Sequence, residues 1–302
     1  MSIQNFYNAC ENGNLEVAQS LFHEKVNIKH AFRKACYCGN LKVAKWLLKQ
    51  KPDIDISDNT FRWVCNYGHL KTAQWLLKIK PNINISVHKE ITFRDACWKG
   101  HLELAQWLLK IKPNIDISAY DELVFRGTCH NGHLETAKWL LKINPNIDIS
   151  IHDELAFRFA CMNENLEVAK WLLKIKPNID VSAYDECAFR GACWRGHLEL
   201  AQWLFKIKPD IDVSACGEHA FCGACEKGHL EVAQWLQSLR PWLYKIIINN
   251  KTLIPHINTP EEQRFQRRKY VVWLYSLKTK MNKECVFHKL PNELLRAIAM
   301  VL

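Results

Sequence analysis

Over the first four-fifths of the chain, one pattern of apolar and polar positions repeats. A Gly-His-Leu tripeptide, or a weaker form of it, marks each copy, with the leucines at positions 15, 41, 70, 102, 134, 166, 198 and 230. The spacing is 26, then 29, then 32 residues five times in succession. A period of this length predicts an array of eight units, each too small to bury its apolar stripe without a neighbour.

Within a unit the pattern predicts two short helices followed by an extended arm. Residues 90–99 carry an i, i+3, i+4 apolar stripe, which is typical of a half-buried helix. Residues 102–110 form a second, more apolar stretch, and Pro113 prevents that helix from continuing. Residues 114–118 then alternate polar and apolar side chains, as a short extended segment does.

This layout resembles the ankyrin repeat. The likeness is carried by residues 189–201, where Gly-His-Leu-Glu separates two helical segments, and by residues 209–214 at the place of the family's hairpin arm. The family's Thr-Pro-Leu-His start is absent and the unit is one residue shorter, as in the ankyrin arrays of amoeba-infecting giant viruses. The resemblance implies an all-α ankyrin-repeat solenoid of about eight helix-turn-helix units over residues 1–239. The unit boundaries expected are 1–28, 29–57, 58–86, 87–118, 119–150, 151–182, 183–214 and 215–239.

Three residue types recur at fixed positions in the units, and we expect all three to be structural. Eight cysteines lie five residues before the marker leucine, where stacked helices about 8–10 Å apart leave them too distant for disulfides. Seven tryptophans lie five residues after it, and we expect them in the core. The histidines occur once per unit, which is too sparse for a shared metal ion. Glu and Arg also recur at i, i+4, which predicts ion pairs along the first helices, at Glu90–Arg94, Glu122–Arg126, Glu154–Arg158 and Glu186–Arg190.

Two positions vary strongly from unit to unit, one just after the repeated cysteine and one two residues before it. Such variation at a stacked position indicates exposure, and the ankyrin resemblance places both positions on the concave, partner-binding face. The candidate partner-binding residues are Trp63, Asp95, Trp98, Phe159, Met162, Trp194 and Arg195. The alternative is that one or two of the aromatic residues are tucked between helices.

The chain lacks the motifs of the common enzyme classes. It has no glycine-rich phosphate loop, no Gly-x-Ser-x-Gly and no His-Glu-x-x-His. Cys216, His219, Cys222 and Cys225 are metal-type ligands at i+3 steps, but on one helix they spread over about 14 Å and do not surround a single zinc ion. We therefore expect no enzyme activity, no cofactor and no metal site.

Charge separates the last fifth of the chain from the array. Residues 240–302 hold 12 Lys and Arg against 4 Asp and Glu, whereas residues 1–239 hold 29 against 27. We expect a connector over 240–258 and a basic helical tail over 259–302, introduced by Thr259 and Pro260. The tail is expected to cap the last repeat; the alternative is a basic face for nucleic acid or an anionic membrane.

The last sixteen residues, 287–302, resemble the opening of an F-box, in the truncated form that ends poxvirus ankyrin proteins. The likeness rests on Leu-Pro-Asn-Glu-Leu-Leu at 290–295. In that family the helix binds the small linker protein of cullin-type ubiquitin ligases. The resemblance implies contacts through Leu290, Pro291, Leu294, Leu295, Ile298 and Leu302. The alternative is an ordinary amphipathic helix that packs on its own chain.

Together these patterns predict a non-enzymatic interaction protein whose target the sequence does not identify. The first function expected is a substrate adaptor, with a target on the ankyrin face and a ubiquitin-ligase linker on the tail. A plain binding scaffold or competitive inhibitor, and nucleic-acid binding through the tail, are the alternatives. The N-terminus has no secretory signal and the 13 cysteines are an odd number, so a monomer with reduced thiols in the cytoplasm is expected, in the host cytosol if the protein is viral.

Overall fold

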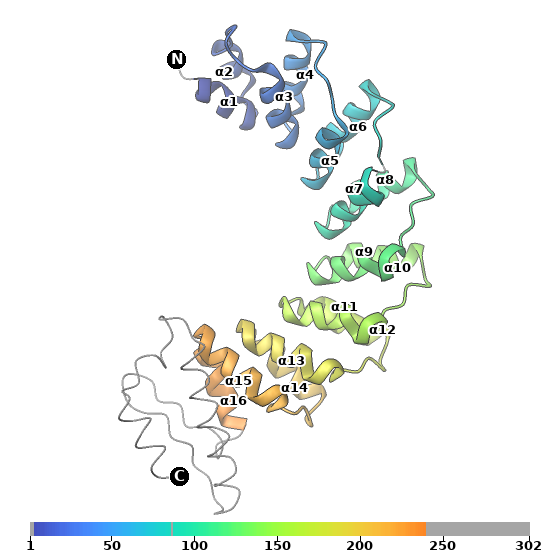
Figure 1. The fold of residues 1–302 in the computed structure, drawn as a ribbon, viewed down its shortest axis with the longest axis vertical. Helices are drawn as coiled ribbons and strands as arrows, with labels where there is room; N and C mark the ends of the chain where they lie inside the picture. The colour runs from blue at the N-terminus through green and yellow to red at the C-terminus, as the bar shows by residue number, and fades with distance from the viewer. Residues whose placement is uncertain (1–2, 86, 240–302) are drawn as a thin grey trace, which may run out of the picture. The chain divides into compact units, whose positions relative to one another are not determined.

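The computed structural model describes residues 3–85 and 87–239, and this part of the chain contains sixteen α-helices and no strand. The helices form eight successive antiparallel pairs, each a first and a second helix joined by a tight turn (Figure 1). The all-α repeat architecture predicted from the sequence is confirmed. The connector and the basic tail, including Leu290, Pro291, Leu294, Leu295, Ile298 and Leu302, lie outside the described residues.

Each pair takes one helix from each of two sets. The first helices are α1 (Ile3–Glu11), α3 (Ile28–Tyr37), α5 (Asp58–Asn66), α7 (Val87–Trp98), α9 (Ala119–His130), α11 (Ile151–Met162), α13 (Ala183–Arg195) and α15 (Ala215–Lys227). The second helices are α2 (Leu15–Ser20), α4 (Leu41–Gln50), α6 (Leu70–Ile79), α8 (Leu102–Ile111), α10 (Leu134–Ile143), α12 (Leu166–Ile175), α14 (Leu198–Ile207) and α16 (Leu230–Leu239).

The chain divides into two compact units, and the first helices stack on one another within each. One unit contains residues up to 160 together with 165–179, and the other contains 161–164 and the residues from 180 onward. In the first unit α1 packs on α3, α3 on α5, α5 on α7 and α7 on α9; in the second, α13 packs on α15. This stacking buries the apolar stripe that no single helix pair covers.

The core is built from small residues and one phenylalanine per repeat. The phenylalanines at positions 6, 32, 61, 93, 125, 157, 189 and 221 are all buried, as are seven of the eight repeated cysteines. Cys225, the eighth, is half-buried. Burial raises the pKa of the Cys10 thiol to about 11, with a smaller contribution from the neighbouring Glu11 carboxylate. These cysteines are packing residues, as predicted.

The repeated tryptophans are half-buried, so the expectation that they lie inside the core is wrong. For six of the seven, the ring packs against the core phenylalanine of the preceding repeat, with the ring centroids 6.0–6.5 Å apart. The pairs are Phe6–Trp46, Phe32–Trp75, Phe61–Trp107, Phe93–Trp139, Phe125–Trp171 and Phe189–Trp235. Tryptophan therefore seals the edge of the core between two repeats, where its size covers the phenylalanine ring.

The segments that lead into α9, α11, α13 and α15 make one left-handed turn before the right-handed helix begins. Three consecutive residues adopt φ values of 53–69° in each, at 120–122, 152–154, 184–186 and 216–218. Such a turn costs about 1–2 kcal/mol per non-glycine residue. Arg126 offsets part of this cost, because its Nε donates to Asp121 O at 2.7 Å and its terminal nitrogen donates to Tyr120 O at 3.1 Å. Arg158 and Arg190 make the same pair of bonds in their repeats.

This turn overturns the predicted ion pairs at Arg126 and Arg190. Because Glu122 and Glu186 lie in the left-handed turn, they are not one helical turn away from those arginines on a common face. Both glutamates are buried, and Glu186 Oε1 accepts a hydrogen bond from the backbone N–H of Asp212 at 3.3 Å. Glu90 instead pairs with Lys112 of the following second helix.

The predicted extended arms are turns and irregular segments rather than strands in the part of the chain that the structure describes. One isoleucine from each arm is nevertheless buried, at positions 54, 83, 115, 147, 179 and 211. The alternation in the sequence therefore corresponds to apolar side chains that enter the core and polar side chains that face solvent, without a β-ladder. No helix in the described ranges is both long enough and apolar enough to cross a bilayer.

Candidate protein-binding face

The two variable positions of the sequence pattern meet across neighbouring repeats. The residue just after the cysteine of one repeat lies against the residue two before the cysteine of the next. The contacts present are Glu11–Lys34, Tyr37–Trp63, Trp98–Gly127, His130–Phe159, Met162–Gly191 and Trp194–Gly223. Each contact lies inside one of the two compact units. The variability at these positions is therefore paired from repeat to repeat.

Three of the pairs place a large side chain over a glycine of the next repeat. A Cβ atom placed on Gly127 would lie 2.0 Å from Trp98 Nε1, and one on Gly223 would lie 2.3 Å from Trp194 Cδ1. A Cβ on Gly191 would lie 2.4 Å from Met162 Cγ. Trp98 also donates its indole N–H to Leu123 O at 3.2 Å. These side chains occupy space that only glycine leaves open, so they are half-buried packing residues with one free edge.

Asp95 is buried, with 8% of its surface exposed, so the expectation that this candidate partner-binding residue is exposed is wrong. Its Oδ2 accepts hydrogen bonds from Arg62 Nε at 3.4 Å and from an Arg62 terminal nitrogen at 3.3 Å. The side chain at this position therefore forms an ion pair with the preceding repeat.

In the second unit, the candidates Arg195 and Trp194 lie next to each other and contact neighbouring polar side chains. Arg195 is exposed, and its guanidinium donates to Asn163 Oδ1 at 2.8 Å. Its central carbon lies 5.9 Å from the Trp194 ring centroid, and Lys227 Nζ lies 4.9 Å from the same centroid. Trp194 is thus flanked by two cations as well as by Gly223, and its ring has little apolar surface left to offer.

Trp63 differs from the other candidates because it is the most exposed of the described tryptophans, at 39%. Its ring centroid lies 6.0 Å from that of Tyr67 at an interplanar angle of 25°, and 6.3 Å from that of Tyr37. Tyr67 is 52% exposed. We call Tyr37, Trp63 and Tyr67 the exposed aromatic cluster; it joins α3, α5 and the turn after α5.

The cluster is held in place by its surroundings. The guanidinium carbon of Arg62 lies 5.6 Å from the Trp63 ring centroid while that same side chain binds Asp95. Tyr67 contacts the ring of His69, the residue that begins the next helix, with centroids 6.5 Å apart. Stacked rings pinned on both sides lose little side-chain entropy on binding a partner.

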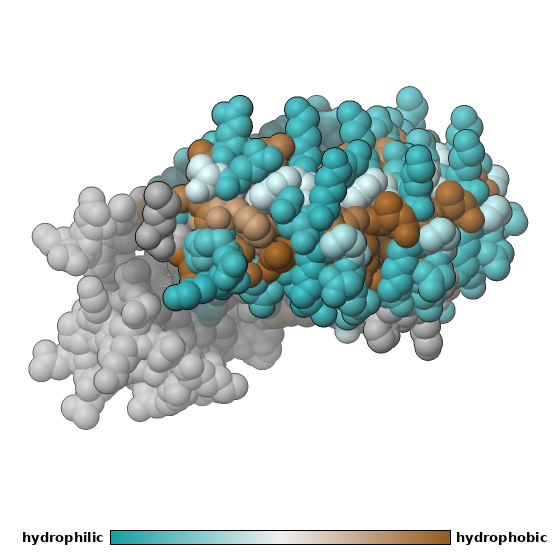
Figure 2. All heavy atoms as spheres, turned by 90° about the horizontal axis from the view of Figure 1, so that it is seen from above, coloured by the Kyte–Doolittle hydropathy of each residue, from teal (hydrophilic) through white to brown (hydrophobic). Residues whose placement is uncertain are grey.

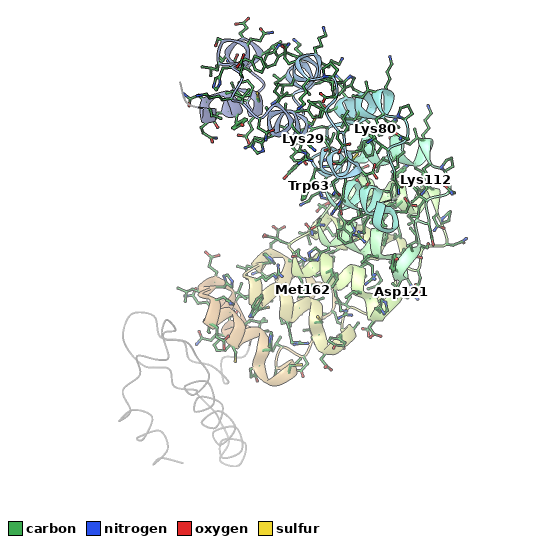
Figure 3. All side chains as sticks on the ribbon, turned by 45° about the horizontal axis from the view of Figure 1, so that its top comes forward. Lys29, Trp63, Lys80, Lys112, Asp121 and Met162 are labelled. Atoms are coloured by element: carbon green, nitrogen blue, oxygen red, sulfur yellow. The ribbon has the colours of Figure 1, made fainter. Side chains whose placement is uncertain are left out.

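Elsewhere in the described part of the chain, exposed apolar residues do not form such a cluster. Hydrophobic patches lie between columns of hydrophilic side chains in Figure 2, and the exposed isoleucines at 79, 111, 143 and 175 recur once per repeat. Single exposed apolar residues are normal on a protein surface, whereas contiguous aromatic rings indicate contact with a partner. Figure 3 places Trp63 on the same side of the first repeats as Lys29, away from Lys80 and Lys112 of the loop side.

The sequence analysis selected Trp63 but missed Tyr37 and Tyr67. Tyr37 occupies a variable position, yet only its contact with Trp63 shows that it belongs to the site. Tyr67 follows the end of α5, at the position that Arg195 occupies in its own repeat, and its contact with Trp63 is visible only in the structure.

The same structure shows no arrangement suited to a metal ion among its described residues, where no three His, Cys, Asp or Glu side chains come together. Cys216 is exposed, with its Sγ 3.9 Å from Asp185 Oδ2, whereas Cys222 is buried.

Comparison with known proteins identifies the repeats. The sequence model of three-copy ankyrin repeats matches residues 6–89, 35–121 and 95–185, and a second ankyrin-repeat model matches residues 185–237. No curated protein matches the sequence.

Solved structures with similar folds include two ankyrin-repeat proteins. The human ASB11 ankyrin repeat domain is 21% identical, with a TM-score of 0.48, over 68% of this chain and 96% of that one. An ankyrin repeat family protein from Legionella pneumophila is 17% identical, with a TM-score of 0.45, over 81% of this chain and 89% of that one. Since the family models together cover far more than half of the sequence, the chain belongs to the ankyrin-repeat family.

Proposed function

We propose that the chain binds a protein target through the first-helix face of its second and third repeats, centred on the exposed aromatic cluster. Ankyrin repeats are protein-interaction modules, and the described part of this chain consists of eight successive helix pairs of that kind. The observation that carries the proposal is that Trp63 and Tyr67 are exposed. The candidate residues Trp98, Met162 and Trp194 are instead packed against a glycine of the next repeat. Tryptophan and tyrosine are the residues most enriched at binding hot spots.

A photo-crosslinking amino acid in place of Tyr67 tests this proposal. The full-length chain carrying it is expressed in the cells that normally make the protein and irradiated, and the crosslinked partner is identified. A matched control carries the same group at Tyr184, which is 65% exposed but outside the cluster. We expect one partner to crosslink at position 67 and not at 184. Crosslinking of the same partners at both positions, or of none at 67, contradicts the proposal.

We also propose, as a second and separable function, that the C-terminal segment delivers the target to a cullin-type ubiquitin ligase. Its support is the sequence of residues 287–302, where Pro291 begins a helical pattern and Leu294, Ile298 and Leu302 share one apolar edge. A pull-down of the purified F-box-binding linker protein by the full chain, and by the chain lacking 287–302, tests it. We expect recovery of the linker to require these residues; equal recovery by both forms contradicts this function while leaving target binding intact.

A further inference from the structure

The charges around the exposed aromatic cluster indicate the chemistry of its partner. Helix α3, which supplies Tyr37, contains Lys29, Arg33 and Lys34 and no Asp or Glu. On α1, α4 and α5, the helices that pack on α3, the acidic residues are Glu11 and Asp58, and Asp95 lies on α7, which packs on α5. Each of these three carboxylates has a bonding partner.

The engagement of the three carboxylates is specific. Glu11 pairs with Lys34, and Asp95 pairs with Arg62. Asp58 Oδ1 accepts a hydrogen bond from the backbone N–H of Asn84 at 3.1 Å. Glu11 and Asp95 are thus neutralised by other cations, and no ion pair joins Asp58 to the two cations that remain on α3.

Lys29 and Arg33 form no ion pair with any carboxylate among the residues that the structure describes. Arg33 also has a buried Nε atom with no hydrogen-bond partner. At the equivalent position of later repeats, Arg126 and Arg190 use this nitrogen to bind the left-handed turn. The segment before α3 has no such turn: Asn27 caps the helix instead, and its side chain accepts from the His30 N–H at 3.0 Å. Arg33 is thus not bonded to the segment before its own helix, as Arg126 and Arg190 are.

From these observations we infer that the exposed aromatic cluster binds an acidic peptide segment of its target, with an apolar side chain against Trp63 and Tyr67 and carboxylates toward Lys29 and Arg33. The inference rests on the proposed function and adds the chemical class of the partner. Apolar contact with the rings supplies affinity, and complementary charge at the rim supplies orientation and association rate.

A peptide is favoured over a nucleic acid by the number of free cations. A polyphosphate chain carries a charge at every residue and is held by many Lys and Arg side chains in a continuous groove. On α3, which carries Tyr37, only Lys29 and Arg33 are cations without an ion pair, because Lys34 is paired with Glu11. A short acidic stretch matches that count.

Selection from a display library of random 12-residue peptides against the full-length chain tests the inference. Counter-selection uses the Trp63→Ala/Tyr67→Ala variant, so that only peptides bound at the cluster are retained. We expect the retained peptides to be rich in Asp and Glu with an aromatic or aliphatic anchor. Retained peptides that are neutral or basic, or no enrichment at all, overturn the inference.

Charge-reversal variants of the chain, each measured for binding to the winning peptide, separate the two proposals. We expect Lys29→Glu to raise its Kd about 5-fold or more at low salt and Lys45→Glu, on the second helix α4 of the same repeat, to change it less than 2-fold. Binding that requires Trp63 but ignores Lys29→Glu refutes the acidic partner and keeps the binding site. Binding that ignores Trp63→Ala refutes the binding site itself. Equal affinity for a 12-nucleotide single-stranded DNA also overturns the inference.

Discussion

The indole ring of Trp98 occupies the space above Gly127 of the following repeat, where a Cβ atom would lie 2.0 Å from Trp98 Nε1. The indole N–H completes the contact by donating to Leu123 O at 3.2 Å. A residue that appears in the sequence as an exposed aromatic on a binding face is therefore largely a stacking contact between two repeats. The same relation holds for Met162 with Gly191 and for Trp194 with Gly223.

The Trp98–Gly127 contact predicts that Gly127→Ala changes the free energy of unfolding in opposite directions with and without Trp98. Gly127→Ala alone should lower the free energy of unfolding by about 1–3 kcal/mol, because the new methyl group displaces the ring. In the Trp98→Ala background the same change should raise it by about 0.5–1 kcal/mol, since alanine is the better residue inside a helix. Urea unfolding of the four proteins measures both values. Equal destabilisation in the two backgrounds would show that the ring does not fill this space.

Acid should weaken the stacking of the middle repeats. His101 donates from Nε2 to Asn66 O at 3.0 Å, and His133 hydrogen-bonds to the backbone of Trp98. Burial lowers the pKa of both imidazoles, and Lys99 and the neighbouring histidine lower it further. A lowered pKa means that the folded state holds these groups neutral, so their contribution is complete above pH 6.5 and is lost as the pH falls below it.

The array itself supplies the control for this pH effect. Asn40 and Asn165 occupy the same position as these histidines, and the Asn165 side chain donates to His130 O at 2.7 Å. We expect His101→Asn/His133→Asn to have a smaller drop in urea midpoint between pH 7.5 and pH 5.5 than the unmodified chain. If the two drops are equal, these histidines are not the groups that take up the protons.

The left-handed turn at residues 152–154, near the start of α11 (Ile151–Met162), predicts that glycine will stabilise a position where it would ordinarily destabilise a helix. Asp153 has φ 53° and ψ 58°. Asp153→Gly should raise the free energy of unfolding by about 0.5–1 kcal/mol relative to Asp153→Ala, because glycine adopts this conformation without steric cost. Gly217 already occupies the equivalent position in the last repeat. Thermal or urea unfolding measures the difference, and a more stable alanine variant would mean that the turn is right-handed.

Thiol reactivity should sort the cysteines by burial. In a Cys285→Ser background, a thiol reagent should modify Cys38 and Cys216 quickly, since both are exposed. The seven buried repeat cysteines should react only on unfolding, because burial raises their pKa and blocks access. Cys38→Ser should remove one fast-reacting thiol. Rapid modification of Cys65 or Cys97 in the folded chain would contradict the packing described above.

The repeat period made the fold predictable, because a residue that recurs at one position must play one structural role. Phe93, Cys97 and Leu108 are buried as the apolar spacing predicts. The left-handed turn was not predictable in this way, since Asp121 and Glu122 are common residues for a right-handed helix start. The predicted Glu122–Arg126 pair was wrong for the same reason.

The binding face was only partly predictable. Variation from repeat to repeat located the right helix face, but it does not distinguish a side chain that contacts a partner from one that contacts the next repeat. Asp95 and Trp98 both lie at varying positions, yet each contacts a neighbouring repeat, through Arg62 and Gly127 respectively. Trp63 differs because its neighbours Tyr37 and Tyr67 are themselves aromatic, a relation visible only in three dimensions.

The central claim is that the exposed aromatic cluster binds the target. Its most direct test is the Kd of the purified full-length chain for the partner crosslinked at position 67, measured for Trp63→Ala, Tyr67→Ala and Tyr184→Ala. Circular dichroism and urea midpoints confirm that each variant is folded. We predict that each cluster substitution raises Kd at least about 10-fold and that Tyr184→Ala leaves it within 2-fold, as expected for hot-spot residues. Unchanged affinity in Trp63→Ala and Tyr67→Ala would contradict the account.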